Sequence, residues 1–93
     1  MTIIPAIVVH GGAWDVVRNL VEPNKVGIRQ SVLAGIGVLK NEGNALDAVE
    51  VAIRVLEDDD SFNAGLGSVL TLDGHIEMDA AIMDGKTLSA GAV

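Results

Sequence analysis

The sequence predicts an α/β fold of the α+β kind, in which one buried strand precedes two helices and an antiparallel meander. Three observations lead to this prediction. A β-branched apolar run occupies residues 3–9, helical periodicity extends over residues 25–57, and short apolar runs alternate with turn signals over residues 68–93. A chain of 93 residues holds one domain at most, so residues 1–93 should form a single domain without an internal boundary.

Composition narrows the class of protein. Thirteen acidic residues against six basic ones give a net charge of −7, which argues against nucleic acid and anionic membranes as partners. The sequence has no cysteine, which excludes disulfide scaffolds, thiolate catalysis and zinc sites of the cysteine type. The N-terminus lacks the basic segment of a signal peptide, and no apolar run approaches membrane-spanning length. We therefore expect a cytoplasmic protein with neither nucleic acid nor membrane as a partner.

The first element is the strand over residues 3–9, whose continuous apolar character is typical of a strand buried on both faces. Because Pro5 lacks an N–H, the strand proper should start at or after it. His10, Gly11 and Gly12 follow directly. Two glycines after a buried strand allow a ligand or another chain segment to approach the backbone closely. The alternative is a tight turn with a hydrogen-bonded structural histidine.

Two helices should follow a charged loop over residues 15–24. The first is predicted over residues 25–41, and its interior glycines each cost about 1 kcal/mol relative to alanine. That cost indicates close packing of this helix against a sheet. Gly43 should stop the helix, because glycine readily adopts the left-handed conformation found after helix ends.

The second helix, over residues 45–57, has the clearest pattern in the chain. Asn44 should cap its N-terminus, with Asp47 at the third helical position as a variant of the capping box. An apolar stripe runs along one face, and Glu50 and Arg54 form a favourably oriented i,i+4 pair on the other. The acids of this helix are interpreted as a solvated face without chemistry.

The remainder predicts a meander of short antiparallel strands. Residues 68–71 should form a strand, Asp73-Gly74 a two-residue hairpin turn, and residues 76–83 the partner strand. After a second turn, residues 88–93 should begin a third strand. We assign Asp79 and Asp84 no role beyond structure.

An unusual segment, LEDDDSFNAGLG at residues 56–67, joins the second helix to this meander. Its three consecutive acids, residues 58–60, lie at a helix C-terminus, where the partial negative charge of the helix disfavours them. Either the acids are solvated on a surface loop, or carbonyl oxygens wrapped by the glycines bind a cation. An EF-hand is excluded, because counting from Asp58 places Asn63 and Val69 where glycine and glutamate are required.

Three motifs in order resemble one known family. VVHGG at residues 8–12, LED…FNAGLGSVL starting at Leu56, and EMDAAIMDGKTLSAGAV starting at Glu77 closely resemble the N-terminal part of the plant-type asparaginase and isoaspartyl peptidase family. The resemblance is strong over residues 7–12 and 45–93. Members are N-terminal nucleophile (Ntn) hydrolases, so the resemblance implies the first half of an αββα four-layer sandwich.

The resemblance also implies an activity. Family members cleave themselves to free a threonine whose α-amino group acts as its own base. They hydrolyse L-asparagine to aspartate and ammonia, and they cleave β-aspartyl (isoaspartyl) dipeptides. The nucleophile lies in a Gly-Thr-Val-Gly motif of the second half, and Thr2, Thr71 and Thr87 have no such context. We therefore expect a fragment that is inactive alone and requires the remainder of the α subunit and the β subunit, in a homodimer of cleaved protomers.

Site residues follow from the same resemblance. Asn63 matches the asparagine that contacts the amino group of the nucleophile, and His10, Gly11 and Gly12 match the glycine loop beside the catalytic threonine. The family has no organic cofactor but binds a structural sodium ion. The expected sodium ligands are the main-chain carbonyls of Leu56, Glu57, Asp59, Phe62, Ala64 and Leu66.

Two other interpretations stay open. The HGG sequence also occurs in α/β-hydrolase esterases, where its amides help to form the oxyanion hole, but the G-x-S-x-G elbow of that fold is not found in this sequence. Alternatively, the chain is a short non-catalytic protein that pairs with a full-length subunit.

Overall fold

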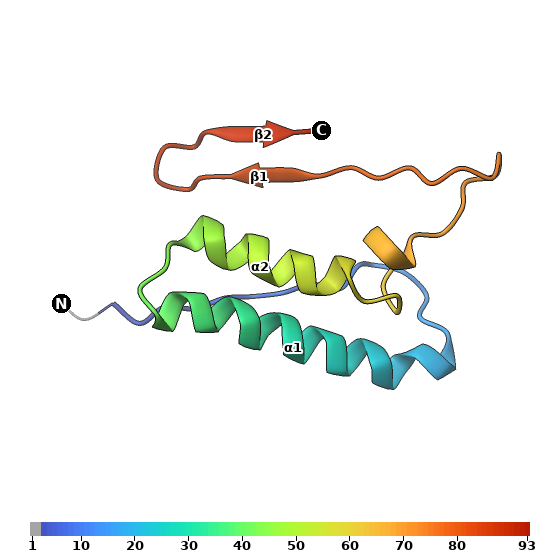
Figure 1. Ribbon diagram of the computed structural model, residues 1–93, viewed down its shortest axis with the longest axis horizontal. Coiled ribbons are helices and arrows are strands. Elements are labelled where there is room, and N and C mark those ends of the chain that lie inside the picture. Colours follow the sequence, from blue (N-terminus) through green and yellow to red (C-terminus); the bar gives the residue numbers. More distant parts are fainter. Residues whose placement is uncertain (1–2) are drawn as a thin grey trace.

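In the computed structural model, which describes residues 3–93, two antiparallel helices pack side by side and a two-stranded antiparallel hairpin lies along one of them (Figure 1). The elements follow the predicted order of two helices and then antiparallel strands, in agreement with the α/β class. They are η1 (Arg18–Leu20), α1 (Val21–Lys40), α2 (Ala45–Glu57), η2 (Gly65–Gly67), β1 (Ala81–Met83) and β2 (Ala90–Ala92).

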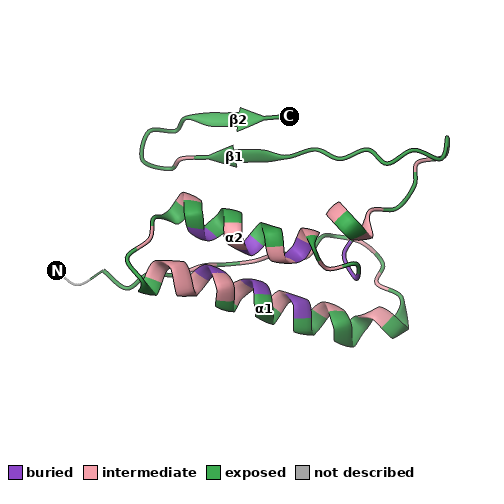
Figure 2. Ribbon diagram, viewed as in Figure 1, coloured by how far each residue is buried: buried purple, intermediate pink, exposed green. Residues whose placement is uncertain are grey.

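Small residues bring α1 and α2 close together. A methyl group built on Gly35 of α1 would lie 3.2 Å from the carbonyl oxygen of Ala48 and 3.4 Å from Cβ of Ala52, both on α2. Ser31 is fully buried beside them. Buried positions lie on the facing sides of the two helices and in the loop after α2 (Figure 2). The predicted packing of the α1 glycines against a sheet is therefore wrong, since Gly35 packs against a helix.

α2 spans the predicted residues 45–57. The side-chain Oδ1 of Asn44 accepts a hydrogen bond from the backbone N–H of Asp47 at 2.8 Å, which confirms the predicted N-cap. Arg54 and Glu50 form the predicted ion pair at 2.8 Å on the exposed face.

α1 begins earlier than predicted. Residues 21–24, expected in a loop, form its first turn, and η1 precedes them. Pro23 allows this, because the first turn of a helix leaves its N–H groups unpaired and proline has none to lose. At the other end, Glu42 adopts the left-handed conformation with φ 65°, and the Gly43 N–H donates to the carbonyl of Val38 at 2.8 Å. The turn after α1 thus uses both residues, whereas the prediction named Gly43 alone.

The predicted buried strand over residues 3–9 is wrong. This segment is extended and runs alongside the helices, but no strand in the described part of the chain pairs with it (Figure 1). Ile3, Ile4 and Val8 are more than four-fifths exposed, whereas Ile7 contacts Gly35 of α1. An apolar run becomes a ladder strand only where a neighbouring strand supplies hydrogen bonds, which local sequence does not reveal.

The meander is shorter than predicted. β1 pairs antiparallel with β2, with Ile82 opposite Gly91, so part of the expected second and third strands forms. Residues 68–71 form no strand, and the N–H of Val69 donates to a side chain, Oδ1 of Asn63. A turn forms at Asp73-Gly74, with φ 81° at the glycine, but it spans three residues instead of the predicted two, because the N–H of Thr71 donates to the carbonyl of His75 at 2.7 Å. No helix within residues 3–93 has the length and apolar character needed to cross a membrane.

Candidate functional site

The acidic loop, residues 58–67 after α2, has one of its three aspartates directed inward. Oδ1 of Asp59 accepts hydrogen bonds from the backbone N–H of Ser61 at 2.9 Å and from its hydroxyl at 2.6 Å. Ser61 and the following Phe62 are only 4% and 3% exposed. Asp58 and Asp60 face solvent. The run of acids is therefore not simply a solvated patch, since Asp59 organises the turn.

Phe62 links this loop to the HGG turn at the other end of the sequence. A methyl group built on Gly11 would lie 2.9 Å from Cε1 of Phe62 and 3.0 Å from Cδ1 of Ile28. Contact that close requires a residue without Cβ at position 11. The aromatic ring thus joins two segments that the sequence separates by about fifty residues.

The HGG turn is closed by its own histidine. The N–H of Gly12 donates to Nδ1 of His10 at 3.0 Å, and Gly12 has φ 106°, where other residues are strained. His10 therefore has the hydrogen-bonded role in the turn that the sequence left as an alternative. Its Nε2 makes no hydrogen bond to residues 3–93.

Asn63 follows Phe62 and is exposed. Its Oδ1 accepts from the N–H of Val69 at 3.0 Å and closes the turn over η2. Its Nδ2 donates to no group in residues 3–93. The side chain can therefore stabilise the turn with one atom and offer the other to a ligand.

A cavity of about 330 Å³ brings the four predicted site residues together. Its lining residues come from the HGG turn, the end of α2, the acidic loop and the segment before β1. They are His10, Gly11, Gly12, Ile53, Leu56, Glu57, Phe62, Asn63, Ala64, Asp79, Ala80 and Ala81. The structure thus places Asn63 and the HGG turn at one site, although they are far apart in sequence.

A second, more open cavity of about 1050 Å³ adjoins the first, and the two share Glu57, Asn63, Ala64 and Asp79 as lining residues. Asp79 was given only a structural role by sequence reasoning. One feature of the sequence could have identified Asp79: it alternates with Glu77 on the polar face of the strand predicted over residues 76–83. Carboxylates beside Asn63 make this site suited to a cationic group such as an ammonium.

The loop geometry fits the predicted cation ligands in part. Gly65 has φ 54°, and a methyl group built on it would collide with the carbonyl of Glu57. A methyl group on Gly67 would collide with the carbonyl of Phe62 and lie 2.6 Å from that of Asp60. These glycines therefore let the carbonyls of Glu57 and Phe62, two of the predicted ligands, lie close to the backbone of positions 65 and 67, which a side chain would prevent.

The hydrogen bonding of the six predicted ligands divides them into two sets. The carbonyls of Glu57, Phe62 and Leu66 accept no hydrogen bond from residues 3–93. The other three already accept hydrogen bonds: Leu56 from Asp58 and Asp59, Asp59 from Phe62, and Ala64 from Gly67. A carbonyl has two lone pairs, so those of Asp59 and Ala64 retain capacity for a cation, whereas that of Leu56 already accepts two hydrogen bonds.

Side chains do not supply an alternative metal site. Within residues 3–93, no group of three His, Asp or Glu side chains lies close enough to hold a metal ion. A cation in the acidic loop would therefore be bound by main-chain oxygens, as monovalent and hard divalent cations accept.

Neither Thr71 nor Thr87 lines the cavity of the HGG turn, although Thr71 lines the larger cavity beside it. Oγ1 of Thr71 accepts from the N–H of His75, and the hydroxyl of Thr87 donates to Asp84 at 3.3 Å, both in turns. Thr2 lies outside the described residues.

Known proteins resemble this chain over nearly its whole length. A family model described as Asparaginase matches residues 3–93. The chain is 62% identical over 89 residues to a plant-type L-asparaginase of Pyrococcus abyssi, covering 95% of this chain and 29% of that protein. It is 56% identical over 89 residues to an isoaspartyl peptidase/L-asparaginase of Xenopus laevis, covering 96% and 29%. The chain thus spans about 29% of the length of the curated relatives it matches.

Proposed function

Because this chain belongs to the asparaginase family, we propose that it supplies the N-terminal part of a threonine hydrolase. The complete enzyme would convert L-asparagine to aspartate and ammonia, and would cleave β-aspartyl (isoaspartyl) dipeptides. The observation that carries this proposal is the cavity of about 330 Å³, which is lined by both Asn63 and the HGG turn. Membership of the family also leaves the esterase alternative without support, since that interpretation rested on the HGG sequence alone.

The nucleophile in this proposal is a threonine contributed from outside these 93 residues. After self-cleavage frees its α-amino group, that amine takes the proton of the threonine hydroxyl. The hydroxyl oxygen then attacks the side-chain amide carbon of the substrate, and the protonated α-amino group gives its proton to the substrate nitrogen, which leaves as ammonia or the peptide amine when the C–N bond breaks. Water hydrolyses the resulting ester and restores the threonine. In this scheme Asn63 contacts the α-amino group and the HGG turn lies beside the threonine.

A structural sodium ion belongs to the proposal. The unpaired carbonyls of Glu57, Phe62 and Leu66, with those of Leu56, Asp59 and Ala64, would hold it. The close approach of the Glu57 carbonyl to Gly65 and of the Phe62 carbonyl to Gly67 supports this assignment. A cation there would offset the negative end of α2 and the adjoining acids, and would fix the turn from which Asn63 projects.

The larger assembly is proposed on family membership alone. The chain would form the first half of an αββα sandwich, completed by the remainder of the α subunit and by the β subunit. Cleaved protomers would form a homodimer in the cytoplasm.

Replacing Asn63 with alanine in the complete gene product tests the proposal. We expect kcat for L-asparagine to fall by about 100-fold or more, or self-cleavage to stop, because a positioned polar group at the reacting amine is lost. Asn41→Ala, an exposed asparagine at the end of α1, is the matched control and should be neutral. If Asn63→Ala matures and turns over normally, Asn63 does not have the proposed role.

A further inference from the structure

We propose that Asn24 and Gly27, in the first two turns of α1, are positioning residues that set where the Asn63 loop lies against the HGG turn. This inference rests on the proposed function, because positioning has a catalytic consequence only if Asn63 serves a nucleophile. Neither residue touches the proposed reacting groups. Both act through the buried pair Ser61 and Phe62.

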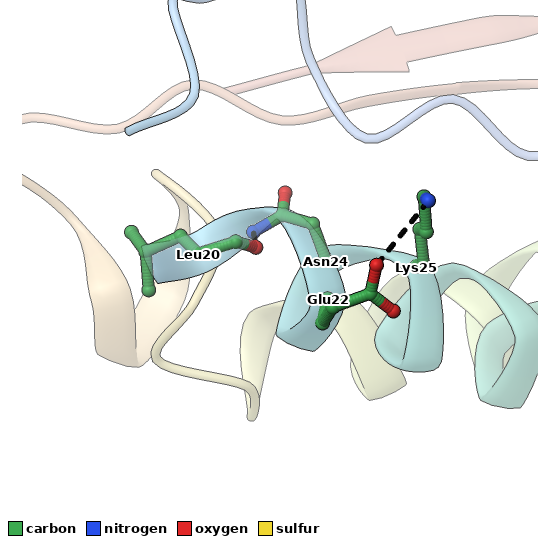
Figure 3. A network of polar contacts seen from close by, with 4 residues as sticks. All are labelled: Leu20, Glu22, Asn24 and Lys25. Carbon is green, nitrogen blue, oxygen red and sulfur yellow. Dashed lines mark hydrogen bonds and ion pairs between the residues drawn. The ribbon is translucent and has the colours of Figure 1, made fainter. Parts of the chain in front are cut away.

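Asn24 forms a polar link between segments 37 residues apart. Its Nδ2 donates to the carbonyl of Leu20 at 2.9 Å within the helix and to the carbonyl of Ser61 at 2.8 Å in the loop. Figure 3 shows the Asn24 amide nitrogen directed at the Leu20 carbonyl, beside the exposed ion pair of Glu22 and Lys25. A side chain with two donors on one nitrogen thus satisfies both carbonyls.

The link fixes the direction of one carbonyl in the acidic loop. The six carbonyls of the proposed sodium site are called the sodium cage. Asp59 and Phe62 contribute carbonyls to this cage, whereas Ser61, which lies between them, does not. Its carbonyl is bonded to Asn24, and its N–H and hydroxyl are bonded to Asp59. All three polar groups of Ser61 are therefore hydrogen-bonded, and the bond from Asn24 is the one that reaches outside the loop.

Gly27 supplies the close contact that accompanies this link. It is buried, and a methyl group built on it would lie 2.5 Å from Cε2 of Phe62 and 2.5 Å from Oδ2 of Asp59. The opposite edge of the same ring faces Gly11, whose added methyl would lie 2.9 Å from Cε1. Phe62 is thus held between α1 and the HGG turn, so a shift at Gly27 is transmitted to both the loop and the turn.

α1 is a suitable support for this contact because it is fixed in turn by α2. The hydroxyl of Ser31, one turn beyond Gly27, donates to the carbonyl of Ala52 at 2.7 Å in a fully buried position. Positioning through a packed helix is more accurate than positioning through a loop alone.

Gly27→Ala in the complete gene product separates positioning from helix propensity. Alanine is the better helix former, so the substitution would be favourable if Gly27 only formed helix. We expect instead that kcat falls by about 10-fold to 100-fold, because small displacements near a reacting group reduce the rate by such factors. KM should stay within about twofold of the wild-type value. Gly37→Ala is the matched control, because Gly37 lies in the same helix with nothing within 4 Å of an added methyl.

A second readout follows the loop without using activity. The amide of Val69 donates to Asn63, so its hydrogen exchange reports whether that turn is closed. Both Gly27→Ala and Asn24→Ala should speed this exchange by about threefold or more, which is the range expected for the loss of one hydrogen bond. Asn19→Ala is the control and should leave the exchange rate unchanged. The double variant Gly27→Ala/Phe62→Leu should recover part of the lost kcat, because a smaller side chain relieves the collision.

Two results distinguish failure of this inference from failure of the proposed function. Wild-type kcat and wild-type Val69 exchange in both Gly27→Ala and Asn24→Ala would overturn the positioning role. If the wild-type protein hydrolyses neither asparagine nor β-aspartyl peptides, while these variants still speed Val69 exchange, the loop is positioned as described and the proposed function is wrong.

Discussion

Ser31 shows how a single residue holds the two helices at their close separation. It is 0% exposed, and its hydroxyl donates across the helix interface to the carbonyl of Ala52. The neighbouring core positions on α2, Ala48 and Ala52, are small, so there is no space for a larger residue to replace the hydroxyl. Forming such a buried hydrogen bond contributes little net free energy, but leaving one of its polar groups buried without a partner costs more.

Ser31→Ala should lower the free energy of unfolding of the complete protein by about 1–3 kcal/mol, because the substitution removes a buried hydrogen bond and leaves a small void. Chemical denaturation measures this change. Ser89→Ala, at an exposed position before β2, should change the free energy by less than about 0.5 kcal/mol. Equal stabilities of the two variants would show that the Ser31 hydroxyl is not needed at the interface.

Asp79 and Asn24 show why some site residues escaped the sequence. Asp79 reaches the Asn63 cavity from the segment before β1, and Asn24 reaches Ser61 across 37 residues. Contacts between distant segments leave no periodic signal in one chain. Asn63 and the HGG turn were found because whole motifs resemble a family, and the structure places both at one cavity.

Among the elements, the acidic loop of residues 58–67 depends most on backbone geometry. Gly65 combines φ 54° with an approach to the Glu57 carbonyl that leaves no room for Cβ. The N–H of Ser68 donates back to the Gly65 carbonyl at 3.2 Å and closes η2. The Glu57 carbonyl can therefore keep this position only while residue 65 lacks a side chain.

Gly65→Ala should therefore weaken sodium binding in the complete protein. We expect the rise in Tm on adding sodium chloride, relative to an equal concentration of choline chloride, to shrink or vanish in this variant. The control is Gly85→Ala, where an added methyl meets nothing within 4 Å. If wild-type Tm is the same in both salts, or if Gly65→Ala keeps the full sodium effect, the proposed sodium cage is wrong.

The elements differ in how far local sequence determines them. α2 was predicted to the residue, because its cap, apolar stripe and ion pair all act within four residues. The start of α1 was missed because Pro23 was interpreted as part of a loop, although a first turn accepts it. The strands over residues 3–9 and 68–71 were wrong because pairing depends on a partner elsewhere, and apolar character alone does not provide one.

At the scale of the whole molecule, the buried residues lie between the helices and in the loop after α2, while the apolar residues of the meander are exposed (Figure 2). Leu72 is fully exposed, and Leu70, Ile76 and Met78 are more than half exposed. Exposed apolar area of this kind marks surfaces that pack against something else. In the proposed αββα sandwich, the remainder of the enzyme would cover them.

We propose that α1, the acidic loop and the HGG turn together place Asn63 at the amino group of a catalytic threonine. A crystal structure of the complete, self-cleaved protein measures the distance between these groups directly. We predict that an Asn63 side-chain atom lies within about 2.7–3.2 Å of the amino group of the new N-terminal threonine, on the side facing Gly11 and Gly12. An Asn63 side chain directed into bulk solvent, with the threonine elsewhere, would contradict this claim.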